Sequence, residues 1–314
     1  MVTCRSAGNE ASRFRARHWL MLLCLLVAGP AAGAPQDWDR LAEGVEHLGA
    51  GRYREAVVTA YALYRTAAET AVLIEAEQLW VESYRQRGDS AGALRRARIL
   101  LAEVKVKRPA SGEVAALEGL ILRVQEAEQA YRRRLAELEA TAAARPGTEE
   151  AARAAYEIAV LHLAAGKINE AVAACNRVGV DYPDSDEARR ARLLQAQAYE
   201  QRGLREAARL VYESLLAASP NTLYGAQAVR SLKRLDIADR DYAVAESRLS
   251  EVIRTYPGTE AAAEALFGLG DLAWIRKQWD LSHGYYRRVV AEYPGSAAAR
   301  EAEARGRFVT PPEG

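Results

Sequence analysis

The sequence is poor in residues that carry chemistry, with 4 histidines, 3 cysteines and 2 methionines among its 314 residues. The histidines are scattered, and none has a second histidine or cysteine three or four residues away, as a zinc motif would require. Phosphate-binding GxxxxGK[ST] loops, GxGxxG turns and GxSxG nucleophile elbows are also absent from the sequence. We therefore expect no metal site, no cofactor and no enzymatic activity.

The cysteines are too few for a disulfide framework, and two of the three lie near the N-terminus. The third, Cys175, falls at a repeat position otherwise held by tyrosine or leucine, which favours a small buried core residue. The chain also has no large excess of charge of either sign. The chain has 43 basic and 42 acidic side chains and a formal net charge of +1, so we expect no nucleic-acid partner.

Proline is not abundant, but six of the ten prolines recur at a fixed interval. Each stands 37 residues after the previous one: Pro109, Pro146, Pro183, Pro220, Pro257 and Pro294. Proline disfavours α geometry in the residue before it, so each should end a helix. A Ser or Thr follows two positions later in every case and can cap the next helix. A fixed interval of this size predicts a solenoid of stacked supersecondary units.

Two helical stretches fit between successive prolines. After Pro183, apolar residues recur at spacings of three and four up to Gly203, and a second such run leads to the next proline. No segment alternates convincingly with period two, so we expect an all-α fold of about seven helix–turn–helix units without a sheet. The expected α-solenoid spans residues 35–307, followed by an expected flexible tail at 308–314. Its units are expected at about 37–66, 69–107, 110–144, 147–181, 184–218, 221–255 and 258–292, with a capping helix at 296–307.

This pattern resembles the tetratricopeptide repeat over nearly all of the chain beyond residue 37. The matching residues are small or aromatic ones at fixed places in the helices and the turn: Ala159, Ala196, Tyr199, Gly203, Ala208, Tyr212 and Gly270. The family period is nominally 34, so three residues are extra here. The unit around Arg240 departs most, because a glycine is expected at that position.

The YPGT and YPDS junctions are similar to those of the bacterial envelope subclass of this family. That subclass includes the outer-membrane assembly lipoprotein of the β-barrel machinery and the periplasmic Tol-Pal-associated cell-division protein. The resemblance implies a right-handed α-solenoid and a non-catalytic scaffold.

The N-terminus reads as a secretory signal over residues 1–34. Arg13, Arg15 and Arg17 precede a short apolar run, WLMLLCLLVA, which small residues follow. The run is too short for a comfortable membrane span, so none is expected after cleavage. Lipidation of Cys24 is not expected, because Leu23 before it is not small. We expect export across the inner membrane and a periplasmic location.

In tetratricopeptide arrays the first helix of each pair lines the concave side, so the resemblance implies a groove for a protein or peptide. Aromatic residues and arginines dominate binding hot spots, and arginines can meet carboxylates on a partner. By register, the groove residues are expected to be Arg153, Tyr156, Arg190, Gln197, Arg230, Arg234, Phe267, Asp271 and Trp274. The alternative is that Tyr156, Phe267 and Trp274 pack between units.

We therefore expect a periplasmic scaffold that binds another envelope protein, in envelope or outer-membrane assembly. One alternative is a non-catalytic accessory module for peptidoglycan processing, and another is an oligomeric structural element. The sequence leaves the partner, the biological process and the oligomeric state open.

Overall fold

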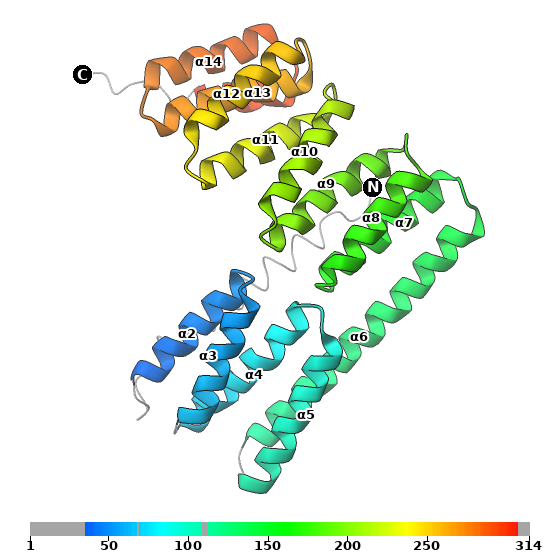
Figure 1. The fold of residues 1–314 in the computed structure, drawn as a ribbon, viewed down its shortest axis with the longest axis vertical. Coiled ribbons are helices and arrows are strands. Elements are labelled where there is room, and N and C mark those ends of the chain that lie inside the picture. The colour runs from blue at the N-terminus through cyan, green and yellow to red at the C-terminus, as the bar shows by residue number, and fades with distance from the viewer. Residues whose placement is uncertain (1–34, 68, 109–111, 307–314) are drawn as a thin grey trace. The chain divides into compact units, whose positions relative to one another are not determined.

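The computed structural model describes residues 35–67, 69–108 and 112–306, and these contain helices, turns and loops but no strand (Figure 1). The predicted signal segment and the predicted tail lie outside the described residues. The described chain forms two compact units. The first comprises residues up to 84 together with 91–123, and the second comprises 85–90 together with 124–306.

The first unit contains α2 (Pro35–Gly49), α3 (Tyr53–Thr66), α4 (Thr70–Gln86), α5 (Ser90–Lys107) and the start of α6 (Glu113–Ala144). Its core lies among α2, α3 and α4, where Leu41, Leu63 and Leu79 are buried together with Trp80. The apolar spacing of three and four in these helices places those side chains on one face. Helices α2 and α3, and then α4 and α5, fall where the sequence led us to expect helix pairs, at about 37–66 and 69–107.

The second unit holds the rest of α6 and a run of shorter helices. These are α7 (Glu149–Ala164), α8 (Ile168–Asp181), α9 (Asp186–Gln201), α10 (Arg205–Ala218), α11 (Leu223–Ala238), α12 (Tyr242–Thr255), α13 (Glu260–Ile275), α14 (Trp279–Glu292) and α15 (Ala297–Gly306). Each helix from α7 to α14 packs on the next, and α15 packs on α14 as the expected capping helix. The all-α solenoid of consecutively packed helices is confirmed, and helices α7 to α14 fall within the ranges expected for the pairs from 147 to 292.

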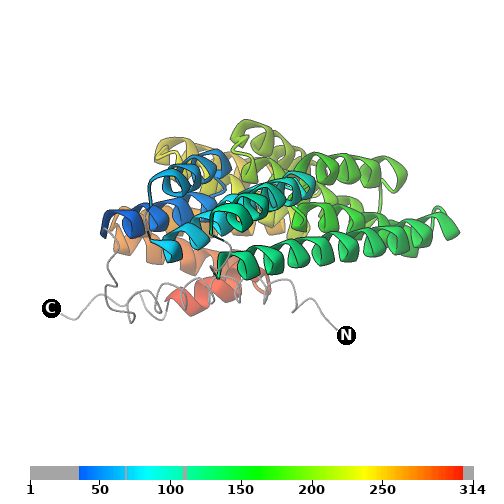
Figure 2. The same ribbon diagram turned by 90° about the horizontal axis from the view of Figure 1, so that it is seen from below.

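The third predicted pair is wrong. Residues 110–144 were expected to form two helices, but α6 is a single helix of 32 residues (Figure 2). Gln129 stands 37 residues before Gly166, where the turn glycine would fall. Residues 120–144 contain no glycine or proline and are rich in Ala, Glu, Leu and Arg, which favour helix. Because nothing in that stretch ends the helix, α6 continues through the expected turn.

The prolines lie at the corners between pairs, as predicted, wherever the structure describes them. Pro183, for example, follows the end of α8 by two residues and precedes the start of α9 by three. At the same corner the Ser185 hydroxyl accepts from the Ala188 amide at 3.0 Å and donates to the Tyr182 carbonyl. Thr148, Thr222, Thr259 and Ser296 accept in the same way at 3.0–3.2 Å. Such a cap is worth ~1 kcal/mol, so each corner both ends one helix and starts the next.

Candidate binding surface on the first helices

The first helices of successive pairs, α7, α9, α11 and α13, and the capping helix α15 pack on one another in the second unit. These helices carry all nine predicted groove residues. Arg153 and Tyr156 lie on α7, and Arg190 and Gln197 lie on α9. Arg230 and Arg234 lie on α11, and the remaining three, Phe267, Asp271 and Trp274, lie on α13. The register assigned from the sequence therefore placed every predicted residue on a first helix.

From α9 onward, each of these helices is linked to the next by a bond between polar side chains that are 34 residues apart. A separation of 34 is three less than the repeat, so each partner lies about one helical turn nearer the start of the next helix. We call this set of bonds the inter-helix ladder. Its pairs, each donor before its acceptor, are Arg190 with Tyr224, Arg234 with Glu200, Arg230 with Glu264 and Arg305 with Asp271.

The central pair of the ladder is Arg230 with Glu264. Arg230 donates from Nε and Nη2 to the two oxygens of Glu264 at 2.9 and 2.8 Å, and Nη2 also reaches Glu301 of α15 at 3.0 Å. The Glu264 side chain is only 2% exposed, and burial raises the pKa of its carboxyl while the bonds from Arg230 oppose that shift. The same bonds raise the pKa of the Arg230 guanidinium. Arg230 thus joins three helices within the chain.

Asp271 also lies inside the structure rather than on an open surface. Its carboxylate accepts from Lys233 Nζ at 2.5 Å, from the Tyr286 hydroxyl at 3.0 Å and from Arg305. With three donors around it and a side chain 14% exposed, Asp271 holds α11, α14 and α15 onto α13. The expectation that this carboxylate faces a partner is wrong, because the chain's own cations surround it.

Phe267 is 1% exposed, so the alternative of packing between units is confirmed for it and its expected role as a surface anchor is wrong. Its ring lies 5.4 Å from that of Tyr286 and beneath the guanidinium of Arg305 at 4.8 Å. Helices α11, α12, α14 and α15 all pack on α13, so residues 261–270 are buried on every side. The sequence held a signal for this, since a helix that is apolar all round is a buried helix.

The other predicted residues keep surface toward solvent. Tyr156 is half-buried against the core of α7, α8 and α9. Arg153 and Gln197 are exposed, and Arg153 pairs with Glu149 of its own helix at 3.1 Å. The side chains of Arg190 and Arg234 are 46% and 60% exposed despite their ladder bonds. Exposed ion pairs such as Arg153 with Glu149 and Arg190 with Asp186 contribute ~0–1 kcal/mol, so these two arginines can exchange partners at little cost.

Sequence reasoning chose Trp274 but missed the residues beside it. Trp274 and Trp279 are each 42% exposed and contact edge to face, with ring centroids 4.6 Å apart. Ile275 and Leu281 nearby are also exposed. The sequence did carry a signal for these residues. The turn at 274–281 reads WIRKQWDL, with two tryptophans, whereas the corresponding turn between α9 and α10 reads EQRGLREA.

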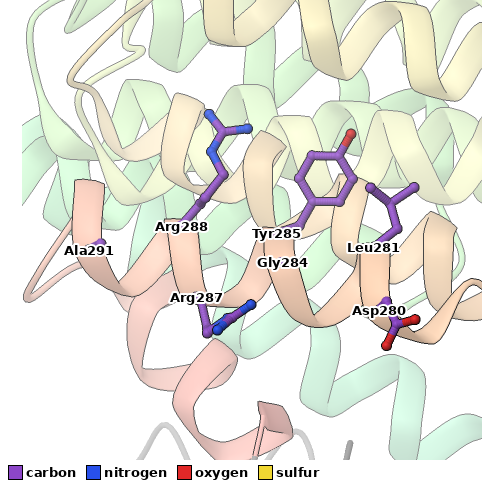
Figure 3. A pocket seen from close by; sticks show the side chains of 7 residues that line it. All are labelled: Asp280, Leu281, Gly284, Tyr285, Arg287, Arg288 and Ala291. Atoms are coloured by element: carbon purple, nitrogen blue, oxygen red, sulfur yellow. The ribbon is translucent and has the colours of Figure 1, made fainter.

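A shallow open hollow of about 640 Å³ follows the outer face of α14 from Asp280 to Ala291. Figure 3 shows that Arg287 and Arg288 point to opposite sides of the helix, so their charges do not converge on one ligand. Within the described residues no group of three or more His, Cys, Asp or Glu side chains is placed to hold a metal ion. Cys175 is buried as expected, and burial raises the pKa of its thiol to about 12.

None of the helices in the described ranges combines the length and apolar character needed to cross a membrane.

Comparison with known proteins supports the repeat assignment. One model of the tetratricopeptide repeat matches residues 153–185 and 190–222, and another matches residues 234–297. No curated protein matches the sequence.

Solved structures that match the chain include a tetratricopeptide repeat protein from Parabacteroides merdae. It has 13% identity and a TM-score of 0.35, and the match covers 87% of this chain and 99% of that chain. The structure of Pseudomonas aeruginosa pilF has 14% identity and a TM-score of 0.31, and the match covers 86% of this chain and 97% of that chain. The structure of BtubC from P. vanneervenii has 13% identity and a TM-score of 0.39, and the match covers 74% of this chain and 95% of that chain.

The chain carries tetratricopeptide repeats between residues 153 and 297, and proteins built from such repeats are generally non-enzymatic scaffolds that bind other proteins.

Proposed function

We propose that this protein is a periplasmic, non-enzymatic scaffold that binds another protein of the cell envelope on the first helices of its second unit. The observation that carries the proposal is the inter-helix ladder, which holds α9, α11, α13 and α15 in one register. A surface that is rigid before binding loses little conformational entropy when a partner docks, which favours affinity. The ladder therefore supports a preformed binding surface.

The partner segment is expected to carry carboxylates. We define the binding surface by its exposed members, Arg153, Arg190, Gln197 and Arg234. Arginine forms bidentate bonds to carboxylates, and at an interface such bonds are stronger than those between neutral groups. Because the side chains of these arginines are 46–61% exposed, a partner's carboxylates can reach them without disrupting the core. Arg230 is left out of this surface, since its bonds to Glu264 are internal.

The location and the process rest on the sequence. The residues 1–34 have the order of a secretory signal, and the YPGT and YPDS junctions resemble those of envelope proteins. A role in envelope or outer-membrane assembly follows from that resemblance alone, so it is an analogy at the level of the family. Cell fractionation with N-terminal sequencing of the purified protein checks the location, with a mature N-terminus near residue 35 as the expected result.

The binding proposal is tested by crosslinking in cells, followed by purification and mass spectrometry of what is captured. Arg153→Glu combined with Gln197→Glu should reduce capture of the main partner at least tenfold, equivalent to ~1.4 kcal/mol. Both side chains are exposed, and neither belongs to the ladder, so helical content by circular dichroism should not change. The matched control is Arg254→Glu on α12, because Arg254 is exposed and pairs within its own helix as Arg153 does.

Two outcomes would contradict the proposal. Equal capture by the double variant and by the wild type would remove the first helices as the binding surface. Retention of the purified protein on isolated peptidoglycan, without any captured protein, would favour the accessory cell-wall function instead. Light scattering over a wide concentration range separates the third possibility, because an oligomeric structural element would grow in mass with concentration.

A further inference from the structure

The first unit carries a further surface, on the side of α5 that faces away from its core. The inner side of this helix is set by Ala97, Leu100 and Val104, which are fully buried. Between residues 95 and 106, five exposed side chains fall on the opposite side within an arc of ~100°, because the helix has 3.6 residues per turn. We call this set the outer stripe, and its members are Arg95, Arg98, Ile99, Ala102 and Val106.

The acidic side chain of α5 points into the unit, and so does one of its arginines. The helix has three arginines, two lysines and one glutamate. The glutamate, Glu103, accepts a hydrogen bond from the Tyr64 hydroxyl of α3 at 2.5 Å. Arg96 lies over the ring of Trp80 in α4, with its guanidinium carbon 3.4 Å from the ring centroid. The outer stripe is therefore left with basic and apolar side chains only.

The positive charge of the outer stripe is only partly balanced by other helices. Lys105, at the edge of the stripe, pairs with Glu118 of α6 at 2.8 Å, and both side chains are about half exposed. Arg95 and Arg98 make no ion pair within the described part of the chain. An exposed pair such as that of Lys105 is weak, so its lysine can take another partner. Cations are thus available along this side of the helix.

The apolar members of the outer stripe have the spacing of a helix–helix seam. Ile99, Ala102 and Val106 recur at intervals of three and four residues, which is the a and d pattern along which two helices pack. Ile99 is 44% exposed and Val106 is 83% exposed, so both have apolar surface to bury. Arg98 and Lys105 stand seven residues apart, at the flanking position that pairs with an opposite charge on a partner helix. The stripe thus combines an apolar seam with a basic edge.

The charge and the width of the outer stripe decide among three possible occupants. A second copy of this chain bound through the same face would bring its own arginines against Arg95 and Arg98, and like charges repel. Helices that bind a lipid surface have Trp, Phe or Leu on a broad apolar face, whereas this seam is one side chain wide and has none of them. A helix with carboxylates beside its own apolar seam complements both the charge and the width of the stripe.

We propose that the outer stripe of α5 is a docking site for an amphipathic helix of another protein. The apolar seam of that helix packs on the apolar members of the stripe, and its carboxylates bond Arg95, Arg98 and Lys105. The stripe rises ~17 Å along its length, so about three turns of the partner are engaged. This site goes beyond the proposed function, because it belongs to the first unit and needs none of the residues on α7, α9 or α11.

A pair of designed peptides tests the chemistry of the partner. Both are amphipathic helices three heptads long with leucine at a and d, and one has glutamate at e and g where the other has lysine. Each is labelled with a fluorophore and titrated with the whole protein, and the anisotropy gives its Kd. The glutamate peptide should bind at least ~10-fold more tightly than the lysine peptide. The difference should shrink as salt rises from ~50 to ~300 mM, because salt screens exposed charges.

Variants of the whole protein locate the site of peptide binding. Arg95→Glu combined with Arg98→Glu should weaken binding of the glutamate peptide at least ~10-fold and strengthen binding of the lysine peptide, a gain that loss of folding does not explain. Val106→Ser should weaken binding of the glutamate peptide at least ~3-fold, because the seam loses apolar contact. The matched control is Val58→Ser on α3, since Val58 is also exposed, at 60%, but lies outside the stripe.

Every other outcome overturns the proposal. Equal binding of the two peptides by the wild type would remove charge complementarity as its basis. Loss of glutamate-peptide binding in Arg153→Glu with Gln197→Glu, but not in the α5 variants, would assign the acidic partner to the first helices alone. Binding to phosphatidylglycerol vesicles without binding of either peptide would replace the helix with a lipid surface. Failure of the α5 variants leaves capture through Arg153 intact, so the two proposals fail independently.

Discussion

Removing Arg230 should destabilise the end of the solenoid in a manner that depends on pH. In Arg230→Met the methionine keeps part of the aliphatic stem but leaves Glu264, whose side chain is 2% exposed, without its two hydrogen bonds. Removal of one partner from a fully buried pair costs ~3–5 kcal/mol. Arg230 itself is 46% exposed, so water can reach the vacated position, and we expect ~2–3 kcal/mol at neutral pH.

Protonation of Glu264 sets the pH dependence. In the folded protein burial raises the pKa of Glu264 above its ordinary value, and loss of Arg230 removes a cause that lowers it. A carboxyl whose folded pKa is raised favours folding below its unfolded pKa, and that contribution is lost as pH rises through the folded pKa. Protonating a carboxyl of ordinary pKa costs ~4 kcal/mol at pH 7.3 but only ~1 kcal/mol at pH 5. Neutralisation therefore limits the penalty strongly at pH 5 and weakly at pH 7.3.

Urea denaturation at the two pH values provides the measurement. Tryptophan fluorescence reports on Trp274 and Trp279 of the last repeat together with Trp38 and Trp80 of the first unit, and far-ultraviolet circular dichroism reports on the helices as a whole. The destabilisation of Arg230→Met should be at least twice as large at pH 7.3 as at pH 5, and Glu264→Gln added to it should restore most of the loss. Arg254→Met, on an exposed pair, should have no effect. The reasoning would be refuted if Arg230→Met lowered the free energy of unfolding by less than ~0.5 kcal/mol at pH 7.3, or by the same amount at both pH values.

Two further predictions concern single positions in the cores. Burial and the neighbouring Glu113 raise the pKa of Glu77 to about 7, so the stability that its protonated form contributes should be lost as pH rises through 7. Glu77→Gln should flatten the stability of the protein between pH 5 and 8 in urea denaturation, and an unchanged slope would exclude Glu77 as its source. Gly270→Ala would place a Cβ 2.5 Å from a ring carbon of Tyr286 and should cost ~1–3 kcal/mol in thermal denaturation. Gly179→Ala, in a helix with no atom within 4 Å of the added Cβ, should instead stabilise by up to ~1 kcal/mol, and equal effects of the two would contradict the packing.

The sequence alone predicted the corners, the caps and the helix pairs, because each of these depends on residues close together along the chain. Proline restricts its immediate neighbour, and a cap such as Ser185 bonds an amide three residues away. The same locality explains the error at α6. The interval of 37 suggested a turn near Gln129, but no residue there ends a helix, so local propensity determined the outcome.

The candidate surface was predictable only in part. Register along the repeat placed all nine predicted residues on first helices, but it could not distinguish the exposed Arg234 from the buried Phe267. That distinction depends on how far each first helix slides and rotates against the next. An offset of three residues, repeated along the ladder, brings Arg230 onto Glu264 and Arg305 onto Asp271.

The order of helices and turns was thus determined by the chain itself, through steric and hydrogen-bonding preferences that act within a few residues. Which charged side chains remain available to a partner was decided only when the helices packed. The ion pairs of the inter-helix ladder form between residues 34 apart, and their geometry depends on the contact between two helix surfaces, which no local pattern in the sequence specifies.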